Sequence, residues 1–292
     1  MTPCIVADLA RHTTAGSRRD AMRLARIATR SLYDELALHP KPGLVSLRSR
    51  GAHRDMDATT FMRSLFALRG YLRDVALAGA CGAAFEEQRA LAVQAEHAML
   101  AATGGVNTHR GAIFSLGMLT ATAAAMLAAG ESRDDKTWRT AIVGRYSEPL
   151  ARLREDNGES HGAAVERSLG VRGACGEAQA GFPNVFERAL PALRRALAAG
   201  ASSDLARLDA LFALLASVDD TNVLYRGGPA ALGWLQREAR AFNASGGALA
   251  HDALRRAEAL DRAMTQRNLS PGGCADLLAC TLFVHAVQVS MQ

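Results

Sequence analysis

The amino-acid sequence predicts an all-α fold, a single multi-helix bundle with functional glycine-rich loops. Hydrophobic residues make up 49% of the 292 residues but aromatic residues only 5%, and abundant alanine and leucine favour helices over strands. Apolar residues recur at helical spacing along nearly the whole chain, and glycine, proline and polar clusters mark the breaks. No internal repeat and no proline- or serine-rich linker divides the chain. We therefore expect one all-helical domain over residues 17–292 after a flexible tail at 1–16.

The first helix is expected to begin near Ser17, which serves as its N-cap. Its broad apolar face consists of Met22, Leu24, Ile27, Leu32 and Leu36. The segment HPKPGLV at 39–45 ends the helix, because each proline disfavours helical backbone in the residue before it. The whole connection over 39–57 is unusually long for a compact domain, which is typical of a functional loop.

Further helices follow this connection. Asp57 can cap the one that starts near Ala58. The last apolar stretch, 275–289, contains Asp276 and is too short to span a bilayer comfortably, so we expect a core helix and no membrane. The expected ranges are 58–80, 86–102, 108–129, 134–155, 159–170, 182–199, 203–217, 229–243, 247–265 and 272–289.

Composition and missing motifs exclude several classes of function. The net charge of +5 attracts anions without singling out nucleic acid, and no RNP-like motif or zinc finger is present. The five cysteines lack CxxC spacing, so neither a disulfide framework nor a zinc site is indicated, and we expect a cytoplasmic protein. P-loop, Rossmann and GxSxG motifs are absent, so those chemistries are not supported. The sequence leaves the oligomeric state open.

A first polar cluster stands at the entrance of an apolar helix, in GVNTHRG at 105–111. Gly104 and Gly105 free the backbone before the helix N-terminus, whose unpaired N–H groups favour anions. The candidate phosphate-binding residues are Asn107, Thr108, His109 and Arg110. The alternative is that Asn107 or Thr108 merely caps the helix.

A second cluster lies on the 39–57 connection. Pro40 and Pro42 stiffen the backbone around Lys41, which lowers the entropy lost when its ammonium binds an anion. Bases then alternate with acids, a mixture suited to holding phosphate through a divalent cation. The candidates are His53 and Arg54 for phosphate, and Asp55 and Asp57 for the metal ion. The alternative is a solvated loop with local ion pairs, in which Asp57 is only a cap.

A third cluster is DDTNVLYRGG at 219–228. Asp219 and Asp220 are expected at a helix end, where adjacent acids repel each other and oppose the dipole of a C-terminus, so a functional role is favoured. Their carboxylates, with the Asn222 amide oxygen, are hard ligands for a cation. The candidates for anion contact are Arg226, Gly227 and Gly228.

Three glutamates are weaker candidates. Glu177 is expected in a glycine-rich turn before a helix opened by Phe182 and Pro183. Glu35 and Glu96 lie on apolar helices and, taken singly, are more typical of paired or exposed residues than of catalysts.

Taken together and in order, these segments resemble the triphosphoribosyl-dephospho-CoA synthase family, which serves citrate lyase and malonate decarboxylase. The matching segments are Glu35, PKPGLV (40–45), GAHRDMD (51–57), GVNTHRGAIFSLGML (105–119), SHG (160–162), GEAQAGFP (176–183), DTNVLYRGG (220–228) and NLSPGG.ADLLA (268–279). They span residues 20–289. Where the family often reads GARGE, this chain has Cys175 in place of the arginine, and the nearby Arg172 is a candidate replacement.

The resemblance implies a pentosyltransferase that joins ATP to 3'-dephospho-CoA, releases adenine and forms 2'-(5''-triphosphoribosyl)-3'-dephospho-CoA. A ribose hydroxyl would attack the anomeric carbon of ATP through an oxocarbenium-like transition state. A nearby carboxylate can stabilise this transition state or accept the proton of the hydroxyl. The product would pass to a transferase for an acyl carrier protein. On overall similarity we expect malonate decarboxylase rather than citrate lyase as the client.

These roles are assigned to the residues singled out above. For catalysis we expect Asp220, Asp219 and Glu177, and for Mg²⁺ we expect Asp55, Asp57, Asp219 and Asp220. For the two substrates we expect Lys41, His53, Arg54, Asn107, Thr108, His109, Arg110, Asn222, Arg226, Gly227 and Gly228. All of this requires the separate loops to converge on one pocket.

Two rival hypotheses use the same residues. One is a magnesium-dependent hydrolase of nucleotides or ADP-ribose, in which the acids activate water. The other is a non-catalytic helical protein that binds an acyl carrier or a CoA-like ligand.

Overall fold

The computed structural model describes residues 14–156 and 171–291, and every regular element in these ranges is a helix. The prediction of an all-α fold is confirmed over this part of the chain. The elements are α2 (Ala15–Ala37), α3 (Ala58–Ala80), α4 (Phe85–Thr103), α5 (Arg110–Ala129), α6 (Asp135–Asp156), α8 (Gly173–Gln179), the π-helix η1 (Asn184–Ala189), α9 (Leu190–Ala198), α10 (Ser203–Leu215), α11 (Thr221–Ala244), the 3₁₀-helix η2 (Gly247–Leu249), α12 (Ala253–Gln266) and α13 (Gly272–Ser290).

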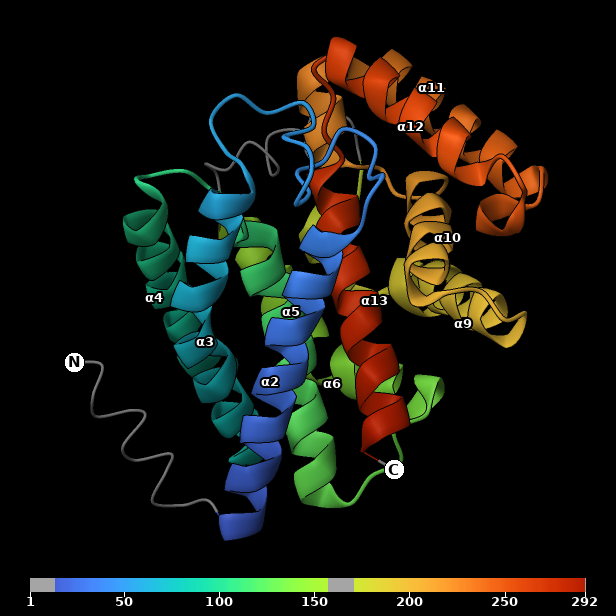
Figure 1. Cartoon of the computed structure of the whole chain (residues 1–292). Helices are drawn as coiled ribbons and strands as arrows, with labels where there is room; N and C mark the ends of the chain where they lie inside the picture. Colours follow the sequence, from blue (N-terminus) through green and yellow to red (C-terminus); the bar gives the residue numbers. More distant parts are fainter. Residues whose placement is uncertain (1–13, 157–170, 292) are drawn as a thin grey trace.

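Five long helices, α2, α3, α4, α5 and α13, pack side by side and form the body of the molecule (Figure 1). The helices α6, α9 and α10 lie beside this body, and α11 and α12 lie together beyond its upper end (Figure 1). The core therefore runs lengthwise between the five helices.

The directions of the five helices gather the polar connections at one end. In Figure 1, α2 and α4 run towards the top, whereas α3, α5 and α13 begin there and run down. The top consequently holds the 38–57 connection, the α4–α5 turn and the start of α13, and we call it the polar end. Because α3, α5 and α13 all begin there, the positive ends of three helix dipoles share one region.

The helices α5 and α13 form the centre of the core. Both are apolar around nearly their whole circumference, as expected of buried helices, and most of their residues are buried. By length and composition both could cross a membrane, yet 78% of the apolar window of α5 and 50% of that of α13 is buried inside the protein. The expectation of a core helix over 272–289 is confirmed.

The N-terminal boundary differs from the prediction. Thr14 is the N-cap of α2 and its Oγ1 accepts a hydrogen bond of 3.1 Å from the Ser17 amide, so Ser17 lies in the first turn instead of capping it. The expected tail therefore extends two residues too far. Residues 1–13, the helix expected over 159–170 and its SHG segment lie outside the described residues.

The second half of the chain also departs from the expected boundaries. The helix α8 occupies the segment expected as a glycine-rich turn around Glu177. The next helix begins as a π-helix at Asn184, where the Glu177 carboxylate accepts hydrogen bonds from both the backbone and the side chain of Asn184. The helix expected over 247–265 begins at Ala253 instead, after the short η2.

The helix α11 begins eight residues earlier than expected, at Thr221 instead of Pro229. Its backbone breaks at Gly228, where φ is 70° and ψ is −174°, and continues as a helix from Pro229. The prediction detected only the part after this break. The reason is chemical: the Asp220 carboxylate caps the first turn, so the DDTNVLYRGG segment starts a helix instead of preceding one.

Candidate active site

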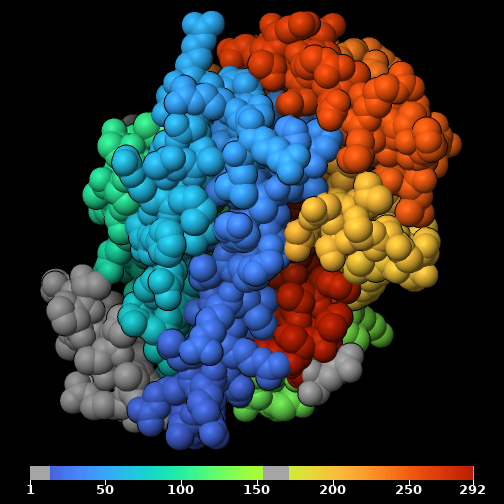
Figure 2. Space-filling model, viewed as in Figure 1, coloured from blue at the N-terminus to red at the C-terminus, as the bar shows by residue number. Residues whose placement is uncertain are grey.

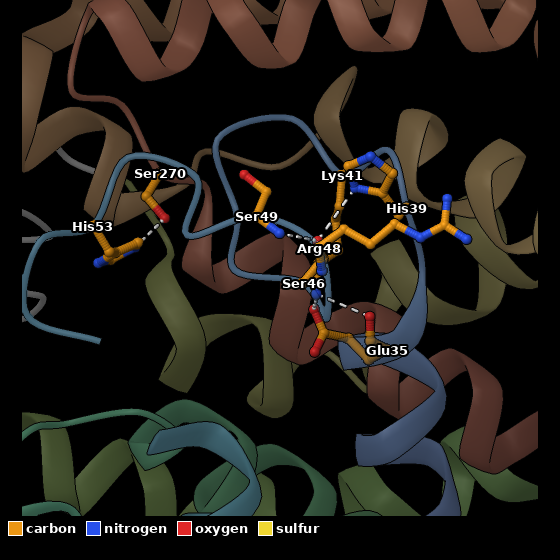
Figure 3. A network of polar contacts seen from close by, with 8 residues as sticks. All are labelled: Glu35, His39, Lys41, Ser46, Arg48, Ser49, His53 and Ser270. Atoms are coloured by element: carbon orange, nitrogen blue, oxygen red, sulfur yellow. Dashed lines mark hydrogen bonds and ion pairs between the residues drawn. The ribbon is translucent and has the colours of Figure 1, made fainter. Parts of the chain in front are cut away.

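The 38–57 connection is fixed to several helices at the polar end. The Gly43 amide donates a hydrogen bond of 2.8 Å to Asp261 of α12, and a Cβ on Gly43 would overlap with the backbone oxygen of Leu269. Within the connection, Ser46 Oγ accepts from the Ser49 amide at 3.1 Å (Figure 3). In Figure 2 the blue surface of this segment lies next to the orange surface of α11 and α12. The connection is therefore an ordered part of the site.

Lys41 and Glu35 form a buried ion pair beneath the connection (Figure 3). The Lys41 ammonium contacts the Glu35 carboxylate and donates a hydrogen bond of 2.8 Å to the Glu35 backbone oxygen. Burial raises the pKa of Glu35 and lowers that of Lys41, and their mutual attraction opposes both shifts. Lys41 was predicted to bind substrate from the proline-stiffened connection, and the structure places its side chain in the interior, 2% exposed. Its contact with substrate stays a prediction.

The second and third predicted clusters meet at the polar end. His53 Nε2 and Ser270 Oγ lie 2.8 Å apart (Figure 3). Arg226 Nη2 lies 3.4 Å from His53 Nδ1. Arg226 Nη1 also donates to the backbone oxygens of Ala52 and Asn268. Burial and the Arg226 charge both lower the pKa of His53. Separate parts of the sequence therefore converge as predicted, and Arg54 is exposed next to them.

The glycines of the third cluster serve the backbone. A Cβ on Gly227 would lie 2.7 Å from Leu269 Cδ2, so a side chain there would collide with the segment before α13. Gly228 forms the break in α11 at a positive φ. Their predicted contact with substrate stays a prediction.

Asp220 caps α11 and ties it to α13. One carboxylate oxygen accepts from the Asn222 and Val223 amides at 2.9 and 3.2 Å, and the other accepts from the Cys274 amide at 2.9 Å. The argument that Asp219 and Asp220 oppose a helix C-terminus was wrong. They precede a helix N-terminus, where a carboxylate is favourable.

The two adjacent acids differ in environment. Asp220 is 1% exposed, and burial raises its pKa in spite of the three amide donors. Asp219 is exposed and accepts a hydrogen bond of 3.3 Å from Gln236. Asn222 is also exposed. Of the two acids, Asp219 is the one open to a ligand from solvent.

The start of α5 leaves two buried polar atoms without a partner among the described residues. His109 is 4% exposed, its Nδ1 lies 2.6 Å from Ser64 Oγ, and its Nε2 is unpaired. Thr108 Oγ1 is also buried and unpaired. Burial and the Lys41 charge lower the pKa of His109 to about 3, so the ring is neutral and offers a substrate a hydrogen bond instead of a charge.

The neighbouring residues of that motif are exposed. The N-cap of α5 is His109, so neither Asn107 nor Thr108 occupies the cap position, but Asn107 Oδ1 accepts from the Arg110 amide of the first turn at 3.2 Å. Arg110 Nε lies 3.0 Å from Glu96 on α4, so Glu96 is a paired residue, as the sequence suggested. The Arg110 side chain remains half-exposed and can face an anion.

The four predicted metal ligands have separate surroundings. Asp57 caps α3 through the Thr60 amide at 3.0 Å and pairs with Arg50, and these contacts lower its pKa to about 2. Asp55 is exposed beside His53. Over the part of the chain described, no three His, Cys, Asp or Glu side chains are grouped to hold a metal ion. A shared magnesium site stays a prediction.

Glu177 is buried on α8 and braces the start of η1. Its carboxylate accepts from the Asn184 amide at 2.7 Å and from Asn184 Nδ2 at 2.8 Å. Burial raises the pKa of Glu177, and the Arg172 charge opposes that shift. Arg172 thus lies within electrostatic reach of this acid, although Cys175 occupies the position of the family arginine.

Sequence reasoning missed Asp276 as a site residue. It lies one turn into α13, half-buried, against the start of α5. A Cβ on Gly111 would overlap with Asp276 Oδ2, and the Ala112 amide donates a hydrogen bond to the carboxylate. Burial and the charges of Glu35 and Asp220 raise its pKa well above the ordinary value. The signal was an acid inside an otherwise apolar helix.

Two cavities lie away from these residues. One, of about 370 Å³, is lined by Phe212, Trp234 and Phe242 between α10, α11 and α12. The other, of about 220 Å³, lies among α3, α4, α5 and α6. Neither is lined by a residue predicted to act on substrate, so the chemistry of the side chains locates the candidate site.

Comparisons with known proteins identify the family to which the sequence is similar. The family model described as ATP:dephospho-CoA triphosphoribosyl transferase (CitG) matches residues 21–292. A probable 2-(5''-triphosphoribosyl)-3'-dephosphocoenzyme-A synthase of Pseudomonas putida is 44% identical over 90% of this chain and 94% of its own length. Proteins of that name from Acinetobacter calcoaceticus and, as synthase 1, Salmonella choleraesuis are each 37% identical, covering 92% and 94% of both chains. No solved structure matches significantly.

Proposed function

The chain belongs to the ATP:dephospho-CoA triphosphoribosyl transferase family, and we propose that its product supplies the acyl carrier protein of malonate decarboxylase. The enzyme joins ATP to 3'-dephospho-CoA and releases adenine. We assign this reaction to the polar end of the helical body. The observation that carries the assignment is the meeting of the 38–57 connection, the start of α5, the start of α11 and the 268–276 segment in one place.

The charges at the polar end suit two polyanionic substrates. Arg54, Arg110 and Arg226 are exposed there and can bind phosphate oxygens. The N-termini of α5 and α13 add backbone donors and positive dipole ends. The buried acids lie deeper, where a positive charge developing on the ribose would be stabilised. In this arrangement the exposed arginines would bind the phosphates, and the anomeric carbon would lie deeper, near the buried acids.

Magnesium would enter with the triphosphate. Mg²⁺ is commonly held by one or two carboxylates together with substrate phosphates, so a group of three protein ligands is not required. Asp57 and Asp220 are committed to backbone amides, whereas Asp55 and Asp219 are exposed. We therefore assign Asp55 and Asp219 as the candidate magnesium ligands. The ion would neutralise phosphate charge and orient the triphosphate.

The client and the location of the enzyme belong to the same proposal. We propose malonate decarboxylase instead of citrate lyase as the client, and the cytoplasm as the location of the enzyme. The product, made in vitro, would be given to purified apo acyl carrier proteins of the two systems with their transferases. Modification of the malonate decarboxylase carrier is expected, and exclusive modification of the citrate lyase carrier would reverse the assignment.

One assay tests both the transferase activity and its assignment to the polar end. Adenine release from ATP should require 3'-dephospho-CoA, and mass spectrometry should identify the joined product. Arg54→Met should raise KM about 10- to 100-fold through loss of one charged hydrogen bond. The matched control is Arg69→Met, an exposed arginine on α3 whose guanidinium lies over Phe66. Adenine release that ignores 3'-dephospho-CoA would favour the hydrolase hypothesis, and an unchanged KM would remove Arg54 from the site.

A further inference from the structure

Three carboxylates from three helices lie close enough at the polar end to affect one another. Glu35 is near the end of α2, Asp220 precedes α11 and Asp276 is one turn into α13. The charges of Glu35 and Asp220 each act on Asp276. The helices α2, α5 and α13 pack against one another around this group. Three negative charges in such a protein interior repel strongly.

The three acids are compensated unequally. Glu35 has the ammonium of Lys41 against its carboxylate. Asp220 accepts three backbone hydrogen bonds, from Asn222, Val223 and Cys274. Among the described residues, Asp276 accepts only one, from the Ala112 amide. Its ionised form is therefore the least stabilised of the three.

The unequal compensation decides which acid carries a proton. When carboxylates share a site, repulsion is relieved by protonating the one whose charge has the weakest support. Glu35 and Asp220 are 4% and 1% exposed, whereas Asp276 is more exposed than either. Asp276 thus combines the weakest support for its charge with the greatest exposure of the three.

The start of α5, which Asp276 contacts, also holds an unpaired buried ring nitrogen, His109 Nε2. His109 Nδ1 is occupied by Ser64 of α3, and Nε2 is buried without a partner among the described residues. The Lys41 charge also acts on this ring and helps to keep it neutral. Leaving a buried ring nitrogen unpaired is unfavourable, and a bound heterocycle or ribose oxygen would satisfy it.

We propose that Asp276 is the general acid of the reaction and protonates adenine as it leaves. This inference rests on the triphosphoribosyl transfer described above. The bond between the anomeric carbon and adenine N9 breaks, and its electron pair goes to adenine. Adenine takes the Asp276 proton and leaves neutral. The 3'-dephospho-CoA hydroxyl forms the new C–O bond and loses its proton to water, and Asp276 regains a proton from solvent.

The pH dependence follows from the groups around Asp276. The groups whose charges interact with Asp276 are Glu35 on α2, Asp220 before α11, and the thiols of Cys274 and Cys280 on α13. His109 and Arg110 lie at the start of α5, which Asp276 contacts. An acid catalyst must be protonated, so kcat should fall at high pH as Asp276 ionises. All the other groups remain in the Asp276→Asn variant. If its kcat no longer falls at high pH, the fall in the wild-type protein is caused by ionisation of Asp276.

The test compares two donors with different leaving groups. With ATP, Asp276→Asn should lower kcat by about 10²- to 10⁴-fold and leave KM nearly unchanged. The second donor is 4-nitrophenyl riboside 5-triphosphate, whose nitrophenolate leaves without a proton. On this donor the variant should retain close to wild-type kcat, because it has lost only proton donation. A residue that merely supports the structure would affect both donors alike.

A matched control is Asp209→Asn on α10. Asp209 is also a buried acid, 6% exposed, that accepts a backbone hydrogen bond, from the Ala248 amide at 2.8 Å. This variant should remain active on both donors. Circular dichroism and thermal unfolding would show that both variants are folded.

Infrared spectroscopy supplies a readout apart from turnover. With ¹³C-labelled aspartate, the wild-type protein at neutral pH should show the C=O stretch of a buried protonated carboxyl, and Asp276→Asn should lack it. The proposal is overturned if that band persists in the variant, if the two donors lose activity equally, or if ATP turnover is unchanged. A wild-type protein that releases no adenine would instead overturn the proposed reaction, and the infrared band would still decide the protonation of Asp276.

Discussion

The buried charges at the polar end and the charges on the outer surface behave in opposite ways, even where they make the same contacts. Asp134 accepts a hydrogen bond from the Thr137 amide at the start of α6, and Asp220 accepts from the Val223 amide at the start of α11. The pKa of exposed Asp134 is lowered by its hydrogen bonds. The pKa of Asp220 is raised, because burial outweighs three such bonds.

The difference shows that a contact alone does not determine the state of an acid. Hydrogen bonds to the ionised form lower a pKa, and removal from water raises it, and the larger effect decides the sign. At the surface the hydrogen bonds dominate. For the buried acids of the polar end desolvation dominates and raises the pKa, as it does for Glu35, Asp220 and Asp276.

The largest effect is expected from breaking the buried ion pair. Lys41→Met should lower the free energy of unfolding by about 3–5 kcal/mol, because Glu35 would be left as an uncompensated buried charge. Urea unfolding monitored by circular dichroism would measure it. The double variant Glu35→Gln with Lys41→Met should recover much of the loss, since it removes both charges.

The surface counterpart is the Arg152–Glu148 pair on α6, whose side chains are 72% and 77% exposed. Arg152→Met should change stability by less than about 1 kcal/mol, because solvent screens such a pair. Equal losses for Lys41→Met and Arg152→Met would contradict the contrast between the two regions.

A smaller effect is expected at the contact between α5 and α13. Gly111→Ala should destabilise the protein by about 1–3 kcal/mol, because the added Cβ overlaps with the Asp276 carboxylate. Gly144→Ala on α6 should do the opposite and stabilise by up to about 1 kcal/mol, since its Cβ would meet nothing and alanine favours helix. Both are read from thermal or urea unfolding.

A second change identifies the cause of the Gly111 effect. Combining Gly111→Ala with Asp276→Ala should restore part of the lost stability, since the overlapping carboxylate is gone. If the double variant were as unstable as the two losses added together, Asp276 would not be the group that Gly111 accommodates.

The fold was largely predictable because apolar spacing is a local property. The ranges of α3, α4, α5 and α13 agree with the predictions within two residues. Errors arose where a cap decides the boundary, as at Asp220, which was assigned to the end of one helix although it begins the next. A cap depends on which backbone amides reach the carboxylate, and the sequence does not show that.

The candidate site was predictable in its components but not in its depth. The meeting of His53 with Arg226 followed from the motifs, whereas the burial of Lys41 depends on how the connection folds over α2. Asp276 was visible as an acid in an apolar helix, but its partners come from three other parts of the chain. Long-range packing determines which acids are desolvated, and spacing along one helix cannot reveal it.

The smallest expected effect is the pH dependence of stability due to the two helix caps Asp57 and Asp220, whose contributions have opposite signs. The folded pKa of Asp57, about 2, lies below the ordinary 3.8, so its contribution to stability is present above 3.8 and is lost as pH falls towards 2. The folded pKa of Asp220 is raised, so the folded state holds the proton more tightly and stability declines as pH rises from 3.8 through the raised value.

Replacing each acid by asparagine should therefore change the slope of stability against pH in opposite directions. Asp57→Asn should remove the part of the unfolding free energy that increases with pH because of Asp57. Asp220→Asn should remove the part that decreases with pH because of Asp220. Unfolding free energies measured from about pH 3 to 7 give both slopes, and comparing slopes separates titration from the hydrogen bond that each substitution also weakens. Slopes that changed in the same direction would mean that Asp220 is hydrated like a surface cap, and the argument for a desolvated acid group around Asp276 would lose its basis.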